Sequence, residues 1–460
     1  MQLTSLAFLI FLLTAVLLYH LLPARFGNHV LLVFSMLFYA SLSLSTFPVM
    51  LIFLWIIYLC GIAVKKLRKG ASFFTVFGII LSIVFLFVYR YLNRYMELSL
   101  TVPLGISYVT FRCISYLADL KSGKVQDTYD PVRFLLYTLF FPKITAGPIE
   151  KPEDFLPQLT KRNDLTDDYI NTGITRISIG FVKKLAIADL LAPGVNAVFN
   201  SPQNADGFSS VTAAIMYSFL ILFDFSGYTD IAIGSASLFG IKLSENFDSP
   251  YTAVSVRDFW KRWHITLTRW LTQYIYIPLG GSRKGNIRRY LNILIVFVIS
   301  GFWHGPTLNF IVWGAIHGIA QVIEILFGSS GKKSDGDKDT DRRSLILKIP
   351  SICFTFLLVT AAWVFFRADS LENALLIFER MITPWADTKV MITRCMPQTD
   401  SLFVMIPAVI FSTVADRINK KEKSTVKTVI TAVISAWIVI LACGISVDSG
   451  VTNNFIYFNF

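Results

Sequence analysis

The sequence has little charge. Asp, Glu, Lys and Arg make up 16% of the 460 residues, whereas 54% are hydrophobic. A soluble domain does not need so apolar a composition to form a core, and apolar runs of about 17–22 residues recur along the chain. We therefore expect an all-α polytopic membrane protein, and the composition argues against a soluble enzyme.

Patterns typical of metal and disulfide sites are also missing. The five cysteines show no CxxC or CxxH spacing, and no histidine has a further ligand at HxxxH or HxxE spacing. These absences argue against a zinc site and against a disulfide framework, so no metal is predicted. The first 27 residues lack a basic n-region and a small-residue cleavage site. We expect them to be a retained first span rather than a signal peptide.

The net charge of +12 lies mostly in short loops between apolar runs. In a soluble protein this excess would suggest nucleic acid, but here the positive-inside rule explains it, and no nucleic-acid partner is predicted. The basic loops at 65–70, 283–289 and 416–427 are predicted to be cytoplasmic, which places the N-terminus outside. The chain is expected to lie in the cell (cytoplasmic) membrane, with the lipid bilayer as its solvent.

The apolar runs predict roughly eleven transmembrane passes, with no separate soluble domain and no internal repeat. The clearest spans are 3–22, 29–45, 47–64, 73–92, 345–366, 400–415 and 428–446. We expect a single membrane domain over 1–460. It comprises N-terminal spans (about 1–95), a core (about 100–328), a polar cytoplasmic loop (328–343) and C-terminal spans (344–460).

Several apolar segments are interrupted by polar residues. Pro142, Lys143 and Pro148 lie within or beside one such run, and interrupted segments suit cavity walls better than lipid-facing helices. The run 211–241 carries DFSGYTD, with Asp224 and Asp230. Carboxylates at membrane depth are expensive, so each is a candidate site residue. The alternative is that they cap or pin broken helices.

The segment 257–274 is predicted to be an amphipathic helix at the cytoplasmic interface. Tryptophans, His264 and leucines follow helical spacing, while Arg257, Lys261 and Arg262 take the other side. With Arg283 and Lys284 of the next loop, these cations form a candidate site for a pyrophosphate-bearing ligand. Ordinary positive-inside charge is the alternative explanation.

The stretch 291–318, LNILIVFVISGFWHGPTLNFIVWGAIHG, begins with an apolar run that is too short to span a membrane. From Leu291 to Trp303 it covers about 13 residues, or about 20 Å of helix, against a hydrocarbon core of about 30 Å. His304 should therefore lie at membrane depth. Gly305 and Pro306 predict a bend or break just after it.

Three of the five histidines, His264, His304 and His317, fall in this region of the chain. Imidazole suits proton transfer near neutral pH, so their clustering suggests acid–base chemistry. His20 and His29 lie near the ends of plain spans and are expected to be structural.

Four blocks carry a family resemblance: FFPKITAGPIEKPEDFLPQL, DFSGYTDIAIGSASLFGIKLSENFDSPY, VRDFWKRWHITLTRWLTQYIYIPLGGSRKG and GFWHGPTLNFIVWGAIHG. Together with AAWVFFRADSLENA (361–374) and the terminal FIYFNF, they resemble the membrane-bound O-acyltransferase (MBOAT) superfamily. The match is with its AlgI-like bacterial branch of alginate and polysaccharide O-acetyltransferases. The resemblance implies re-entrant and interfacial helices around a central tunnel.

The resemblance also assigns roles. His304 occupies the position of the catalytic histidine, His264 matches a second polar residue in an RWH or RWN context, and His317 matches a further histidine of the bacterial branch. His304 is the candidate general base, and His264 could orient the substrate or hydrogen-bond the thioester oxygen. His317, Asp224, Asp230 and Lys143 are possible accessory residues.

By resemblance, the protein is expected to be an O-acetyltransferase. Its donor would be acetyl-CoA or another acyl thioester, with no bound cofactor. It would move acetyl groups from the cytoplasm for O-acetylation of an exopolysaccharide, with an extracytoplasmic, esterase-like partner transferase completing the ester. Whether transfer is direct or passes through an acyl-histidine is open. D-alanyl transfer to teichoic acid and peptidoglycan O-acetylation are alternatives within the superfamily. A transporter or lipid-linked sugar flippase is the alternative from another class.

Overall fold

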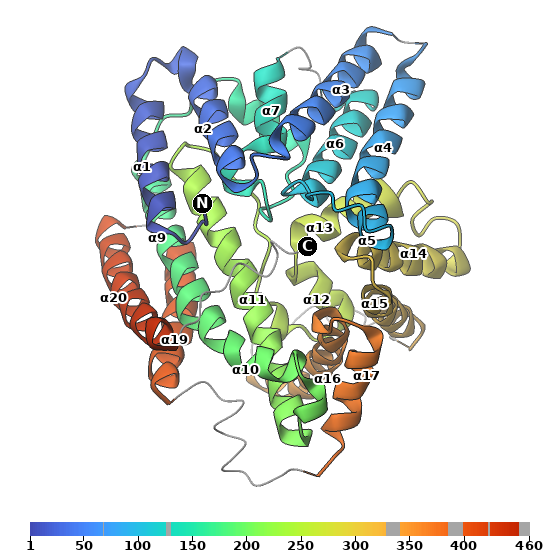
Figure 1. The fold of residues 1–460 in the computed structure, drawn as a ribbon, viewed down its shortest axis with the longest axis vertical. Helices are drawn as coiled ribbons and strands as arrows, with labels where there is room; N and C mark the ends of the chain where they lie inside the picture. Colours follow the sequence, from blue (N-terminus) through green and yellow to red (C-terminus); the bar gives the residue numbers. More distant parts are fainter. Residues whose placement is uncertain (68, 126–129, 328–340, 385–398, 422–423, 450–460) are drawn as a thin grey trace. The chain divides into compact units, whose positions relative to one another are not determined.

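The computed structural model describes residues 1–67, 69–125, 130–327, 341–384, 399–421 and 424–449 (Figure 1). Within these ranges the regular elements are helices, and the one β-type pairing is an isolated bridge between Phe247 and Trp263. The all-α prediction is therefore confirmed. The chain divides into two compact units: unit 1 comprises Met1–Ile187, Phe223–Ser244 and Phe403–Phe460, and unit 2 comprises Ala188–Leu222 and Glu245–Leu402.

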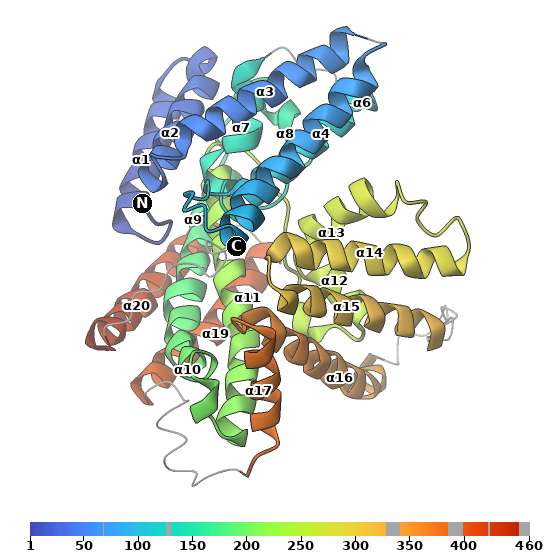
Figure 2. The same cartoon turned by 45° about the vertical axis from the view of Figure 1, so that its right-hand side comes forward.

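The N-terminal part of unit 1 comprises the helices α1 (Leu6–Leu21), α2 (Gly27–Leu42), α3 (Phe47–Lys66), α4 (Ala71–Phe87), α5 (Asn93–Tyr95), α6 (Ile106–Lys121), α7 (Pro131–Leu139) and α8 (Pro152–Phe155). Helices α3, α4 and α6 pack against one another and lie side by side in both views (Figures 1 and 2). Gly61 of α3 and Gly78 of α4 face Tyr116 and Leu117 of α6, where an added Cβ would collide. Small residues therefore allow the close approach of these helices.

The rest of unit 1 is built on α9 (Asp167–Phe181), which continues as the π-helix η5 (Val182–Ala188), on the second half of α11 (Gly207–Ser237), and on α19 (Thr399–Lys421) and α20 (Thr425–Ser449). Glycines line the contact of α9 with α11. A Cβ on Gly180 would lie 2.7 Å from the carbonyl oxygen of Gly227, and one on Gly234 would lie 2.7 Å from that of Gly173. The two backbones are in direct contact, as in small-residue interfaces between membrane helices.

Unit 2 holds the first half of α11 and all the predicted histidines of interest. Its other helices are α10 (Asp189–Phe199), α12 (Val256–Arg262), α13 (Ile265–Leu271), α14 (Asn286–His304), α15 (Leu308–Phe327), α16 (Asp341–Arg367) and α17 (Leu371–Met381). Helix α15 packs against α12, α14, α16 and α17. Figure 2 shows α14, α15 and α16 side by side. Helix α15 is thus the central element of this unit.

Six helical segments among the described residues are long and apolar enough to cross a membrane: Phe47–Lys66, Ala71–Tyr95, Gly207–Ser237, Leu308–Phe327, Lys348–Arg367 and Thr425–Ile445. Two shorter apolar helices, Leu6–Leu21 and Leu402–Ala415, coincide with further predicted spans. The chain is a multi-pass membrane protein. The count of roughly eleven passes, the central tunnel and the single-domain boundaries stay predictions. Of the predicted polar loop, residues 328–340 lie outside the described residues, as does the terminal segment 451–460.

Candidate active site

His304 is the last residue of α14, and the helix ends where the sequence predicts. Gly305 follows as an extended C-cap residue, and α15 begins three residues later at Leu308. The predicted break after the imidazole is therefore confirmed. His304 is 3% exposed, and its ring lies 4.7 Å from the Trp303 ring, 5.0 Å from Trp313 and 5.0 Å from Phe366 between centroids. The imidazole is thus enclosed by aromatic rings.

The hairpin of α14 and α15 packs too closely for side chains at three glycines. A Cβ on Gly301 would meet the carbonyl oxygen of Phe310, a Cβ on Gly314 would meet that of Phe297, and a Cβ on Gly305 would overlap the Phe310 ring. Since the two backbones touch on either side of the break, the position of His304 relative to α15 is fixed by packing.

His264 lies between two short helices, not on one continuous helix. The predicted amphipathic helix 257–274 is wrong in this respect: α12 ends at Arg262, and α13 begins at Ile265. Residues before α12 cause the break. Ile265 N donates to the Asn246 carbonyl (3.0 Å), Thr266 Oγ1 donates to Asn246 Oδ1 (2.6 Å), and Phe247 forms the bridge to Trp263.

His264 itself has left-handed backbone dihedrals, with φ 43° and ψ 53°, and its side chain is 1% exposed. Holding a non-glycine residue in the left-handed region costs on the order of 1–3 kcal/mol of folding free energy, and such strained residues cluster at functional sites. Burial also lowers the pKa of His264 to about 3, because a buried imidazolium would lose its water. The imidazole is therefore neutral at physiological pH.

His264→Gly and His264→Ala should separate the backbone from the side chain. Both remove the imidazole, but alanine keeps the left-handed strain, so the glycine variant should be more stable than the alanine variant by about 1 kcal/mol. If the imidazole serves the reaction, the two should lose activity to the same extent. Thermal unfolding in detergent and initial rates measure the two quantities. If the glycine variant were both more stable and more active than the alanine variant, the loss of activity would reflect stability, which would contradict a role for the imidazole.

His317 lies in α15, one turn after Trp313, and is fully buried. Trp260 of α12 donates from Nε1 to His317 Nδ1 at 3.2 Å. The rings of His304 and His317 both stand edge-to-face against Trp313, at centroid distances of 5.0 and 5.2 Å. The structure therefore brings His304 and His317 together around one tryptophan.

His264 is connected to the same aromatic cluster through its neighbour in sequence. Trp263 packs on Trp363 of α16 at 5.0 Å, and Trp363 stacks on Trp313 at 5.8 Å. All three predicted histidines thus belong to unit 2; the rings of His304 and His317 lie in one aromatic cluster, and His264 is the residue next to one of its members, Trp263. In the described part of the chain, no three His, Cys, Asp or Glu side chains are grouped as metal ligands.

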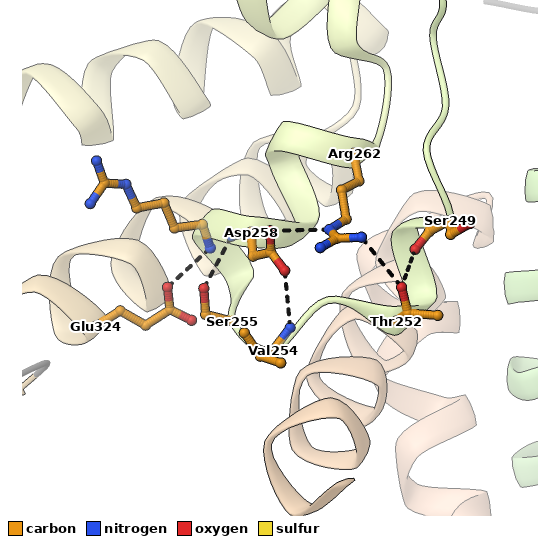
Figure 3. A network of polar contacts seen from close by, with 8 residues as sticks. Ser249, Thr252, Val254, Ser255, Asp258, Arg262 and Glu324 are labelled. Atoms are coloured by element: carbon orange, nitrogen blue, oxygen red, sulfur yellow. Dashed lines mark hydrogen bonds and ion pairs between the residues drawn. The ribbon is translucent and has the colours of Figure 1, made fainter. Parts of the chain in front are cut away.

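A polar network anchors α12 to α15 (Figure 3). The Glu324 carboxylate of α15 accepts from the backbone N–H groups of Val256 and Arg257, and Ser255 caps the helix by accepting from Asp258 N at 3.0 Å. Glu324 lies seven residues, or two turns, after His317. Helix α12 is therefore held to one face of α15 at two points, by Glu324 and by the Trp260–His317 hydrogen bond.

A pocket of about 230 Å³ lies between α12, α13, α14 and α15. Trp260, Phe297 and Ile325 make its wall apolar, Ser300 lines it with a buried hydroxyl, and Arg257 and Arg289 supply positive charge. Along α14, Arg289 and Ser300 are eleven residues apart, or about 16 Å, and His304 follows Ser300 by one turn. The pocket thus extends from two arginines toward the last turn before His304.

The five predicted donor-binding cations divide into two groups. Arg257 lines the pocket. Arg262 instead pairs with Asp258, Nε to Oδ1 at 3.1 Å, and reaches Thr252 (Figure 3). Lys261, Arg283 and Lys284 are exposed and are not among the lining residues. Sequence reasoning missed Arg289, although its place in the first turn of an apolar helix was a usable signal.

Asp224 and Asp230 belong to unit 1, where they form buried ion pairs. Lys184 Nζ lies 2.8 Å from Asp224 Oδ1, while Arg176 and Lys183 contact the two oxygens of Asp230 at 2.9 and 2.8 Å. Helix α11 runs unbroken past both residues, so they do not cap helix ends, contrary to the alternative drawn from sequence. The pairs flank the Gly180–Gly227 contact and tie η5 to α11.

Lys143 is also in unit 1 and is fully buried. Its ammonium lies 3.5 Å from the centre of the Phe155 ring and 4.9 Å from that of Tyr137, a cation–π arrangement. Burial lowers the pKa of Lys143 well below its usual value. Arg112 acts in the same direction, and Glu150 opposes it. Arg112 also donates to the carbonyls of Thr138 and Lys143, which holds the buried irregular segment after α7 in place.

Comparison with known proteins identifies the family. A model of the membrane-bound O-acyltransferase (MBOAT) family matches residues 83–333. The chain belongs to this family. The MBOAT match includes all four blocks in full, among them both predicted catalytic histidines, and it extends over parts of both units.

Relatives place the chain in the bacterial branch of the MBOAT family. It is 33% identical over 386 residues to a probable alginate O-acetylase AlgI of Pseudomonas aeruginosa, covering 80% of this chain and 72% of that protein. A peptidoglycan O-acetyltransferase of Helicobacter pylori is 32% identical, covering 76% and 72%. A teichoic acid D-alanyltransferase of Bacillus subtilis is 28% identical, covering 55% and 67%. The predicted AlgI-like MBOAT assignment is confirmed, and the protein is an O-acyltransferase.

Proposed function

We propose that the protein transfers an acetyl group from cytoplasmic acetyl-CoA, or another acyl thioester, for O-acetylation of an extracytoplasmic polysaccharide. The observation that carries this proposal is the arrangement in unit 2. A buried histidine at a helix break lies one turn beyond a pocket lined by two arginines. The similarity to alginate O-acetylases supports acetyl as the acyl group and a polysaccharide as the acceptor.

The chemistry needs one base. As the acceptor hydroxyl oxygen attacks the thioester carbonyl carbon, a C–O bond forms, the C=O electron pair moves to oxygen, and the hydroxyl proton passes to His304. When the tetrahedral intermediate collapses, the C–S bond breaks and the sulfur takes the proton from His304. A positioned imidazole contributes typically a 10²–10⁴-fold rate enhancement. The aromatic enclosure of His304 limits water, which would otherwise hydrolyse the thioester.

His264 is proposed to orient the substrate. It is neutral and buried, and its strained backbone is fixed by the hydrogen bonds that Asn246 makes with Ile265 and Thr266. Strained residues persist where the surrounding structure fixes them, which suits a positioning role.

The donor is proposed to occupy the pocket in unit 2. Arg257 and Arg289 would meet the phosphates of the donor, and the apolar wall would hold its chain with the thioester toward His304. This placement requires the α14 N-terminus to face the cytoplasm. The basic loop before α14 supports that orientation and, by the positive-inside rule, an external N-terminus in the cell membrane.

A separate extracytoplasmic, esterase-like transferase is proposed as the partner that completes the ester on the polymer. This partner and the polymer are carried over from the family resemblance. Peptidoglycan O-acetylation is the second candidate function, supported by the relative from Helicobacter pylori. D-alanyl transfer has weaker support, since the matching relative covers only 55% of this chain. Membership of an acyltransferase family weighs against the transporter alternative.

Arg257→Gln and Arg289→Gln should raise the KM for acetyl-CoA by up to about fivefold each. An exposed charge contact contributes up to about 1 kcal/mol, and every 1.4 kcal/mol is tenfold. The kcat should change little, because neither side chain touches the reacting atoms. The measurement is acetyl-CoA consumption by purified protein in liposomes, with the extracytoplasmic partner transferase and soluble polysaccharide present.

Arg288→Gln is the matched control. Arg288 is next to Arg289 in α14, carries the same charge and donates to the Leu279 carbonyl at 3.4 Å, but it does not line the pocket. Its KM should stay near the wild-type value. An equal rise for all three variants would mean that general surface charge attracts the donor, and wild-type protein that consumes no acetyl-CoA would contradict the proposed donor.

A further inference from the structure

Helix α15 carries two buried N–H donors that find no acceptor. Trp313 Nε1 and His317 Nε2 have no hydrogen-bond partner among the residues that the structure describes, although the two side chains are 1% and 0% exposed. The residues are four apart and so lie on one face of the helix. An unpaired buried donor costs about 1–3 kcal/mol, so each instance calls for an explanation.

The proton on His317 Nε2 follows from its other nitrogen. The indole N–H of Trp260 is a donor only, so His317 Nδ1 must accept at their 3.2 Å contact. A neutral imidazole with Nδ1 as acceptor carries its proton on Nε2. His317 therefore presents a donor on that side, and neither of its nitrogens is available to take a proton from a hydroxyl.

Two other indole N–H groups of the same cluster, those of Trp260 and Trp363, do find acceptors. Trp363 Nε1 donates to the Tyr251 hydroxyl at 3.2 Å, and this hydroxyl donates to the Ser218 carbonyl at 2.6 Å. The cluster thus pairs the indole N–H groups of Trp260 and Trp363. The unpaired donors belong to the two rings that are in contact with each other, and one of them, Trp313, also packs edge-to-face against His304.

We propose that Trp313 Nε1–H and His317 Nε2–H are the hydrogen-bond donors for the thioester oxygen during acyl transfer at His304, and that Trp260 is the positioning residue that fixes the His317 tautomer. This inference rests on the proposed function. These two N–H groups form and break no covalent bond themselves, so the proton transfers and the C–O and C–S bond changes proposed for His304 stay the same. The two N–H groups stabilise the negative charge that the carbonyl oxygen acquires when the C–O bond forms, and they release it when the C–S bond breaks.

The two histidines of the hairpin then have opposite roles. His304 takes the hydroxyl proton, and His317 gives a hydrogen bond without losing its own proton. Trp260 connects this arrangement to the donor pocket, since its ring lines the pocket while its N–H bonds His317. Acetyl-CoA bound in the pocket would therefore lie against Trp260, the residue that sets the His317 tautomer.

Kinetics of conservative variants test the donors. Trp313→Phe and His317→Phe keep an aromatic ring and remove the N–H, and each should lower kcat by about 10²–10³-fold with KM for acetyl-CoA within about threefold of wild type. His317→Gln should recover part of the loss, because its amide can accept from Trp260 and still donate. Trp363→Phe is the control: it removes a buried indole hydrogen bond of the same cluster, and its kcat should stay within a few-fold of wild type.

Wild-type kcat in His317→Phe or Trp313→Phe would overturn the assignment, as would an equal loss in Trp363→Phe, which would indicate a packing effect. Wild-type protein that consumes no acetyl-CoA would instead overturn the proposed function. The tautomer has its own readout. In protein labelled with ¹⁵N-histidine, the NMR signals of His317 should show Nε2 protonated and Nδ1 unprotonated. Trp260→Phe should give a mixture of the two neutral tautomers and lower kcat. A wild-type His317 protonated on Nδ1 would overturn the role of Trp260.

Discussion

Replacing His304 with alanine should lower kcat for acetyl transfer by about 10²- to 10⁴-fold, the usual contribution of a positioned general base. The KM for acetyl-CoA should change little, because the donor pocket ends one turn before His304. The measurement is acetyl-CoA turnover in liposomes, together with a thermal unfolding curve. The unfolding curve is needed because the missing imidazole leaves a gap against Trp303, Trp313 and Phe366, which lowers stability without bearing on proton transfer.

His29→Ala is a control for this experiment. His29 lies in α2 of unit 1 and is exposed, so its removal should leave both stability and turnover near wild type. His304→Gln is the more demanding variant, since it restores a polar side chain of similar size but has no basic nitrogen. Wild-type turnover in either His304 variant would remove this residue from the reaction.

The break beside His304 could be predicted because its causes are local. A short apolar run sets the depth, and Gly305 and Pro306 come directly after the imidazole, so the sequence there carries the information by itself. The structure has α14 ending at His304. The same holds for the long apolar helices α3 and α4, whose length and hydropathy predict spans.

The break beside His264 could not be predicted because its cause is distant. The apolar spacing of 257–274 is compatible with one helix, and no glycine or proline interrupts it. Asn246 and Phe247 instead take over the backbone and side-chain hydrogen bonds around Trp263 and Thr266. Such a tertiary interaction overrides helical periodicity. Its visible consequence is the left-handed backbone conformation of His264 between α12 and α13.

The partners of the intramembrane charges were also beyond the sequence. The residue type alone shows that burying Asp224 and Asp230 at membrane depth costs free energy. Their pairing with Lys184, Lys183 and Arg176 depends instead on the register between two helices. One signal was available. Glycines recur at a spacing of seven in both helices, at 173 and 180 and at 227 and 234, and they meet pairwise.

Replacing Lys184 with methionine should destabilise the protein by about 3–5 kcal/mol. The change leaves the Asp224 carboxylate, 1% exposed, without the ammonium that lies 2.8 Å from it, and removing one partner of a buried ion pair is strongly destabilising. Asp224→Asn should be milder, since the amide is neutral and can still accept a hydrogen bond from the Lys184 ammonium. The measurement is thermal or denaturant unfolding in detergent at one protein concentration.

The double variant Lys184→Met/Asp224→Leu decides what the pair does. Removing both charges together should restore most of the stability, because a well-packed apolar pair can replace a buried ion pair at little cost. Lys124→Met, which breaks a pair with Glu153 whose side chains are 42% and 32% exposed, is the control and should cost at most about 1 kcal/mol. If the double variant regains stability and turnover, the pair only joins η5 to α11. If it regains stability but not turnover, Asp224 and Lys184 serve the reaction as accessory residues.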